Sequence, residues 1–142
     1  MYADDIQIYR HATHKDFPAA IDAINDDLVS ISEWSKRYGL NINPSKSQAI
    51  IIGSPGMISK VDLFNLPAVE YRGTTIPYYS NVKDLGVYLD QTLSWSVQIK
   101  EVSRKIFAAL SSLRRLQSVL PIPTKIMLAN SLLLSILDYA DA

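Results

Sequence analysis

Residues 17–40 read FPAAIDAINDDLVSISEWSKRYGL and decide how the first part of the chain folds. Apolar side chains recur there at steps of three and four residues, which places them on one face of an α-helix. Asp16 suits the N-cap, and Pro18 is tolerated in the first turn. Gly39 suits the left-handed residue that ends a helix, with Leu40 as its usual apolar partner. The sequence predicts an amphipathic helix with an apolar face of Phe17, Ile21, Ile24, Leu28, Ile31 and Trp34.

Short segments of alternating or continuous apolar residues flank this helix and predict β-strands. Asn43-Pro44-Ser45 is a typical turn sequence between two of them. Two further strands follow, joined through residues 77–81, and we expect them to form one β-hairpin with an irregular connection. The predicted strands cover residues 5–9, 40–42, 48–52, 69–76 and 82–89.

The last third of the chain has a helical period. One stripe contains Trp95, Ile99, Val102, Ile106, Ala109, Leu110, Leu113 and Leu116. Pro121-Ile-Pro123 breaks it, and a second helix is expected over residues 124–139. That helix is apolar nearly all round, so it should be buried or cover a partner surface. Its most apolar part spans about 12 residues, short of the roughly 20 that cross a bilayer, so we expect no membrane segment.

Composition limits the possible classes of protein. A length of 142 residues suits one domain or a slice of a larger one, and the hydrophobic fraction of 48% is that of a globular chain. The absence of cysteine excludes a disulfide framework, a thiolate zinc site and a cysteine nucleophile. The order of strands and helices predicts an α+β fold.

The net charge of zero hides a segregation of charges. Residues 1–90 contain eight basic and eleven acidic side chains, whereas residues 91–125 contain six basic side chains against Glu101 alone. On a helix with about 100° per residue, four of these basic residues fall within an arc of about 100°, roughly opposite the apolar stripe. They are Lys100, Arg104, Arg114 and Arg115. This face suits contact with a polyanion, although a solvated helix face is the alternative.

Asp4 and Asp5 are adjacent carboxylates near the start of the chain, in the sequence Tyr2-Ala-Asp-Asp5. Like charges at this spacing raise each other's pKa unless a cation intervenes. A hard divalent cation such as Mg²⁺ prefers oxygen ligands, so a metal site is one interpretation. Because neighbouring side chains on a strand point to opposite faces, a complete site needs a further carboxylate from elsewhere. A solvated Asp-Asp turn is the other interpretation.

Four blocks in order resemble the reverse transcriptases of non-LTR retrotransposons, the LINE-type and jockey-like group. Residues 2–5, YADD, resemble the YxDD box of these enzymes. Trp34 followed by GLNINPSKS at residues 39–47 resembles their next block. VKDLGVYLD at residues 82–90 resembles their primer-grip hairpin, and the two C-terminal helices are similar to their thumb. Together the blocks span nearly the whole chain.

This resemblance implies a partial polymerase palm, an antiparallel sheet with a packed helix and a β-hairpin, over residues 1–90, and a helical thumb over residues 91–142. It implies RNA-directed DNA polymerase activity with two Mg²⁺ ions. Asp4 would be a metal ligand and Asp5 the supporting carboxylate. Lys46 would lie near the triphosphate, Tyr2 beside the primer–template end, and Gly86 would allow close approach of the primer backbone.

Such enzymes have fingers and the first half of the palm before the YxDD box, including another metal-binding aspartate. We therefore expect an incomplete Mg²⁺ site, an exposed sheet edge and no polymerase activity from this chain alone. The partners implied for the parent enzyme are an RNA template, a DNA primer, deoxynucleoside triphosphates and the missing N-terminal half. An intracellular location, in the nucleus or cytoplasm, is expected.

Two other interpretations remain open. The chain could be a non-catalytic remnant that binds nucleic acid through its basic helix while the aspartates have no role. It could also be a structural or interaction domain with an accidental motif match. Steep salt dependence without Mg²⁺ dependence would favour the remnant, and absence of nucleic-acid affinity would favour the interaction domain.

Overall fold

A computed structural model describes residues 5–62, 65–116 and 118–139. Helices and short antiparallel strands both occur there, which agrees with the predicted α+β class at this level of detail. The chain divides into two compact units, residues 1–82 (unit 1) and residues 83–142 (unit 2). This division lies ahead of the boundary expected after Asp90. The assignment of residues 1–90 to a palm and 91–142 to a thumb stays a prediction.

Helix α1 of unit 1 spans Phe17–Arg37 and confirms the predicted amphipathic helix. Pro18 lies in its first turn, as predicted. Asp16 occupies the N-cap position, but its carboxylate makes no capping bond to the helix backbone. It accepts a hydrogen bond from the Thr13 hydroxyl instead, at the end of a short 3₁₀ helix, η1, His14–Asp16. The expected side-chain cap is therefore wrong.

The end of α1 follows the prediction. Gly39 has a φ of +69°, a left-handed conformation that glycine adopts without a steric penalty. The backbone N–H of Leu40 donates to the carbonyl of Ser35 at 2.8 Å, and the N–H of Gly39 donates to that of Lys36 at 3.3 Å. These two bonds satisfy carbonyl groups that the last helical turn leaves without an intrahelical partner.

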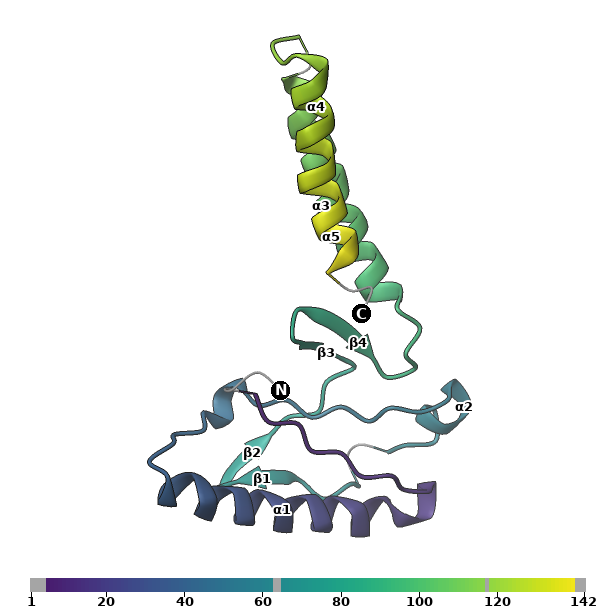
Figure 1. Cartoon of the computed structure of the whole chain (residues 1–142). Helices are drawn as coiled ribbons and strands as arrows, with labels where there is room; N and C mark the ends of the chain where they lie inside the picture. Colours follow the sequence, from purple (N-terminus) through teal and green to yellow (C-terminus); the bar gives the residue numbers. More distant parts are fainter. Residues whose placement is uncertain (1–4, 63–64, 117, 140–142) are drawn as a thin grey trace. The chain divides into compact units, whose positions relative to one another are not determined.

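The strands β1, Val69–Tyr71, and β2, Thr74–Ile76, form a tight hairpin that packs on α1 (Figure 1). Their antiparallel register pairs Val69 with Ile76 and Tyr71 with Thr74. The core between helix and hairpin consists of Ile21, Val69, Tyr71 and Ile76, with Ile24, Leu28, Ile42, Ala49, Leu66 and Tyr78 packed around it. Three of the six residues on the predicted apolar face of α1 thus contribute to this core, namely Ile21, Ile24 and Leu28.

Polar contacts also join α1 to the hairpin. The Asn25 side-chain amide donates to the Ala68 carbonyl and accepts from the Glu70 N–H, both at 3.0 Å, and so pairs with the free edge of β1. The Arg72 guanidinium donates to the Ser32 hydroxyl at 2.7 Å and to the Ser35 hydroxyl at 3.0 Å. Ser32 and Ser35 are buried, and these bonds satisfy hydroxyl groups that burial would otherwise leave without water.

Three predicted strands are wrong. Residues 5–9 and 40–42 form no strand, and residues 48–52 contribute a single parallel bridge between Ala49 and Tyr78. The turn at Asn43-Pro44-Ser45 is confirmed, since a 3₁₀ helix, η2, spans Pro44–Lys46. A short helix, α2, spans Pro55–Ile58. The alternation of apolar and polar residues indicates which side chains could share one face of a sheet. A strand forms only where its backbone N–H and C=O groups pair with a second strand.

The predicted single hairpin over residues 69–89 is also wrong, because each predicted strand folds back on itself. The second hairpin consists of β3, Asn81–Asp84, and β4, Val87–Asp90. Both turns have two central residues with positive φ, Arg72 at +51° with Gly73 at +75° and Leu85 at +45° with Gly86 at +91°. Paired positive φ values match the right-handed twist of two-residue hairpins.

The helices of unit 2 lie side by side (Figure 1). Helix α3 spans Ser96–Arg115 and confirms the predicted helix. The second predicted helix begins earlier than expected, with Pro121 at its N-cap. It consists of α4, Ile122–Ala129, a π-helical segment, η3, Asn130–Leu134, and α5, Ser135–Asp138. No helix within the described ranges is both long and apolar enough to cross a membrane.

Much of the apolar surface of unit 2 is exposed. Of the two alternatives expected for the second helix, burial within this chain is therefore wrong, because two helices shield only their facing sides, and coverage of a partner surface stays a prediction. The predicted stripe of α3 is likewise covered in part: Val102, Ile106, Ala109 and Leu113 are half-buried, whereas Trp95, Ile99, Leu110 and Leu116 are exposed. On the second helix the exposed large side chains are Ile122, Ile126, Met127, Leu132, Leu134, Leu137 and Tyr139.

Replacing Tyr71 with alanine tests whether the α1–hairpin core carries the stability of unit 1. Tyr71 is 2% exposed, and removing a buried aromatic ring costs about 3–5 kcal/mol of unfolding free energy. We expect Tyr71→Ala to unfold unit 1 or to lower its urea midpoint strongly. Tyr9→Ala is the matched control, because Tyr9 is 91% exposed and its loss should change stability by less than about 0.5 kcal/mol. Equal effects of the two changes would contradict this core.

Candidate nucleic-acid interface and carboxylate site

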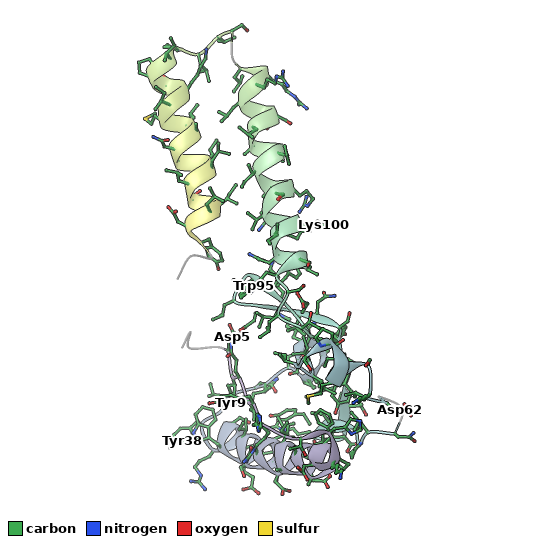
Figure 2. The ribbon with its side chains drawn as sticks, turned by 90° about the vertical axis from the view of Figure 1, so that its right-hand side faces the viewer. Asp5, Tyr9, Tyr38, Asp62, Trp95 and Lys100 are labelled. Atoms are coloured by element: carbon green, nitrogen blue, oxygen red, sulfur yellow. The ribbon has the colours of Figure 1, made fainter. Side chains whose placement is uncertain are left out.

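The predicted carboxylate site lies mostly outside the described residues. Tyr2 and Asp4 are not described, and Asp5 is exposed at the beginning of the described chain (Figure 2). Within the described residues, no group of three or more His, Asp or Glu side chains is arranged to hold a metal ion. The metal-binding roles of Asp4 and Asp5 stay predictions.

Lys46 is the last residue of η2 and is exposed. The local sequence fixes its backbone, because the Asn43 side-chain oxygen accepts from the Ser45 N–H at 3.0 Å and from the Ser45 hydroxyl at 2.7 Å. Such side-chain bonds mimic a backbone turn. The Lys46 ammonium is thus carried by a well-defined turn and is accessible to an anionic ligand.

Gly86 lies in the turn between β3 and β4, and Tyr139 occupies the space beside it. A Cβ atom added at Gly86 would lie 2.7 Å from Cε1 and 2.8 Å from the hydroxyl oxygen of Tyr139. The Tyr139 hydroxyl also donates to the Leu85 carbonyl at 2.8 Å. Tyr139 therefore occupies the space that a side chain at position 86 would need. The role of Gly86 in nucleic-acid binding stays a prediction.

Two further contacts involve Tyr88 of β4, one with α3 and one with β3. Gln98 is 8% exposed, and its side-chain oxygen accepts from the Tyr88 N–H at 2.9 Å. A buried amide of this kind needs such a partner. Across the hairpin, the Lys83 ammonium lies 5.7 Å from the centre of the Tyr88 ring, within the range of a cation–π contact. Gln98 was not among the predicted site residues, because a polar residue at a helix start gives no sequence signal of burial.

Asp90 organises the loop that leads from β4 into α3. Its carboxylate accepts from the Ser94 N–H at 3.0 Å, the Thr92 hydroxyl at 2.8 Å, the Ser94 hydroxyl at 3.0 Å and the Thr92 N–H at 3.1 Å. Hydrogen bonds to the charged form lower a carboxyl pKa. They lower the pKa of Asp90 from 3.8 to about 2, with the Ser94 N–H contributing most.

The predicted basic face of α3 is accessible. Lys100, Arg104, Arg114 and Arg115 are all exposed, and the Lys100 side chain projects away from the neighbouring helix (Figure 2). Arg104 is paired with the acidic residue of this segment, because its guanidinium binds the Glu101 carboxylate at 2.9 and 3.1 Å. The Arg104 bond lowers the pKa of Glu101, and the Glu101 bond raises the pKa of Arg104. Arg104 is thus partly neutralised.

A groove of about 440 Å³ between α3 and α4 adds a basic residue that the sequence prediction omitted from the site. Leu110, Leu113 and Ala129 form its apolar part, and Arg114 and Lys125 its charged part. Lys125 belongs to the basic segment of the sequence, which was the available signal. Lys125 lies beside Arg114 because the chain reverses direction after Pro121 and α4 packs against α3. The periodicity of a single helix cannot predict such a contact between two helices.

These features occur in a chain that is similar to RNA-directed DNA polymerases encoded by transposons. The chain is 28% identical over 111 residues to the "Probable RNA-directed DNA polymerase from transposon X-element" of Drosophila melanogaster. It is 26% identical over 113 residues to the "Probable RNA-directed DNA polymerase from transposon BS" of the same organism. These matches cover 78% and 80% of this chain but only 11% and 12% of the relatives. No protein-family model and no solved structure matches the chain.

The Asp90 loop predicts a specific acid response. Because the pKa of Asp90 is lower in the folded chain, its carboxylate stabilises unit 2 above pH 3.8, and this contribution is lost as the pH falls towards about 2. An NMR titration of the Asp90 side chain should show a midpoint near pH 2, and Ser94→Ala should raise it. Ser118→Ala, the same change outside the loop, should leave the midpoint in place. A wild-type midpoint near 3.8 would contradict the loop geometry.

Proposed function

We propose that this chain is a piece of a reverse transcriptase from a non-LTR, jockey-like retrotransposon. It would comprise the C-terminal part of the palm (1–90) and a thumb-like segment (91–142). The observation that carries the proposal is the similarity to two transposon RNA-directed DNA polymerases over about four fifths of the chain. The motif blocks YADD, GLNINPSKS and VKDLGVYLD support it, because they follow one another in the order found in that group.

The aspartates of the YADD block would contribute to nucleotide transfer in a complete enzyme. Asp4 and Asp5 would hold Mg²⁺ together with an acid from the missing half of the palm. Bound Mg²⁺ supplies activation of the primer 3′-hydroxyl and stabilisation of the leaving pyrophosphate. Lys46 would neutralise charge on the triphosphate, since its ammonium is exposed on a fixed turn. Tyr2 would pack beside the primer–template end.

The basic face of α3 would follow the phosphate backbone of the template–primer duplex. Lys100, Arg114 and Arg115 would neutralise phosphates directly, and Lys125 lies beside Arg114 to extend the contact. Cations on one helix face release counterions from nucleic acid, so binding should weaken as salt rises. This role would place the chain in the nucleus or cytoplasm, where RNA templates and DNA primers occur.

A second candidate is a non-catalytic nucleic-acid-binding remnant of the same kind of element. The exposed basic face favours it, because this face needs no metal and no missing half to bind phosphate. The two candidates differ in their dependence on Mg²⁺ and on the aspartates. Both predict nucleic-acid affinity, and an interaction domain with an accidental motif match predicts none.

Primer extension tests the catalytic part of the proposal. The purified chain, an RNA template with an annealed DNA primer, deoxynucleoside triphosphates and Mg²⁺ should give no incorporation above background, because the chain corresponds to only 11% and 12% of the length of the two polymerases that it matches. A complete reverse transcriptase run in parallel shows that the substrate is competent. Incorporation that the Asp4→Asn change abolishes would prove the expected inactivity wrong.

Neutralising the basic face tests nucleic-acid binding. Arg114→Gln with Arg115→Gln should weaken binding to an RNA–DNA duplex and reduce the slope of log K against log salt by about one for each lost phosphate contact. The matched control is Lys36→Gln with Arg37→Gln at the end of α1, which removes the same charge from exposed residues of unit 1. Equal slopes for both double variants would contradict a specific role of α3.

Glu101 should weaken nucleic-acid binding by α3, because its carboxylate pairs with the Arg104 guanidinium. Glu101→Gln removes the carboxylate charge and frees the guanidinium for phosphate, so affinity at low salt and the salt slope should both increase. Glu33→Gln makes the same charge change at an exposed residue of α1 and serves as the control. Fluorescence anisotropy at several salt concentrations measures both quantities. An unchanged affinity in Glu101→Gln would exclude Arg104 from the interface.

A further inference from the structure

The turn of the β3–β4 hairpin is packed differently from the turn of the β1–β2 hairpin. Both turns contain a glycine with positive φ, Gly86 at +91° and Gly73 at +75°. A Cβ atom added at Gly73 would have no heavy atom within 4 Å, whereas one at Gly86 would lie 2.7–3.1 Å from three atoms of the Tyr139 side chain. Backbone conformation alone therefore accounts for glycine at position 73. At position 86 the absence of a side chain also leaves the space that the Tyr139 ring fills.

Tyr139 makes a polar contact with the same turn. Its hydroxyl donates to the Leu85 carbonyl at 2.8 Å, a good hydrogen-bond distance. Leu85 has a φ of +45°, which a leucine adopts only at an energetic cost, so an added bond to its carbonyl helps to hold the turn. Tyr139 follows directly after α5. It therefore connects the end of the second helix to the tip of the hairpin.

The other end of the hairpin is held by α3. The Tyr88 N–H donates to the buried Gln98 side chain at 2.9 Å, near the first turn of α3. The hairpin is thus attached to the helical pair at two points, through Gln98 at β4 and through Tyr139 at the turn. Two attachments restrict rotation of the hairpin about either one alone.

We infer that Tyr139 is a positioning residue, which clamps the Leu85–Gly86 turn so that the hairpin presents a fixed surface to the 3′ end of a nucleic-acid strand. The clamp itself rests on the contacts above, and the strand contact rests on the proposed function. Displacing Tyr139 should loosen the turn without changing the basic face of α3. A loosened turn should lose discrimination between strand ends, while the phosphate contacts of α3 persist.

A double-mutant cycle tests the clamp. Gly86→Ala should destabilise unit 2 more in the wild-type chain than in Tyr139→Ala, because the second background removes the clashing ring. Gly73→Ala, which adds backbone strain alone, should show no such coupling to Tyr139. Hydrogen exchange at the β3–β4 amides should accelerate about fivefold in Tyr139→Phe, for loss of one hydrogen bond. Additive effects in the cycle, or unchanged exchange, would overturn the clamp.

Binding measurements test the functional consequence separately. The probes are an RNA–DNA duplex with a recessed primer 3′ end and the same duplex with blunt ends. We expect the wild-type chain to prefer the recessed end, Tyr139→Ala to lose this preference with an unchanged salt slope, and Tyr139→Phe to keep most of it because the ring remains.

Each remaining outcome has a defined meaning. Persistence of the preference in Tyr139→Ala, with circular dichroism showing intact helices, would overturn the positioning role. If the double-mutant cycle shows coupling but the wild-type chain shows no preference for the recessed end, the clamp would stand and the contact with a primer end would be refuted. No affinity for either duplex in the wild-type chain would refute the proposed function itself.

Discussion

Burial of Tyr71 between α1 and the β1–β2 hairpin is the constraint on which unit 1 depends. Among the described residues its side chain is the largest that is fully buried, and its hydroxyl lies 3.4 Å from the buried Ser35 hydroxyl. The neighbouring Arg72 reaches back to Ser32 and Ser35 and lies 5.2 Å from the centre of the Tyr71 ring. The buried apolar residues of the described part of unit 1 all belong to this cluster, so the helix and hairpin stabilise each other through this contact region.

The same contact explains an unusual backbone conformation. Arg72 has a φ of +51°, which is uncommon for a residue with a side chain. Three hydrogen bonds from its guanidinium to the Ser32 hydroxyl, the Ser32 carbonyl and the Ser35 hydroxyl hold it there. In unit 2 the corresponding turn residue, Leu85, is held through its carbonyl by Tyr139. Each hairpin turn is therefore stabilised by a helix that is distant in sequence.

Some features of the candidate site can be predicted from local sequence patterns, and others cannot. The exposure of Lys100, Arg114 and Arg115 follows from helical periodicity, since residues opposite an apolar stripe face water. The ion pair of Arg104 with Glu101 was available from their spacing of three residues on a helix. The burial of Gln98, the placement of Lys125 beside Arg114 and the cover of Gly86 by Tyr139 have no local signal. They arise where separate elements meet.

Local sequence patterns are enough to predict the two long helices, the end of α1 at Gly39, the turn at Asn43 and the basic face of α3, because each follows from bonds or periods within a few residues. Which extended segments become strands, and where those strands turn back, depends instead on contacts between distant parts of the chain. Residues 5–9 alternate like a strand yet form none in the described chain, whereas residues 69–76 fold into a hairpin against α1. A strand is defined by backbone partners and a buried face, and both are supplied by residues far away in the sequence.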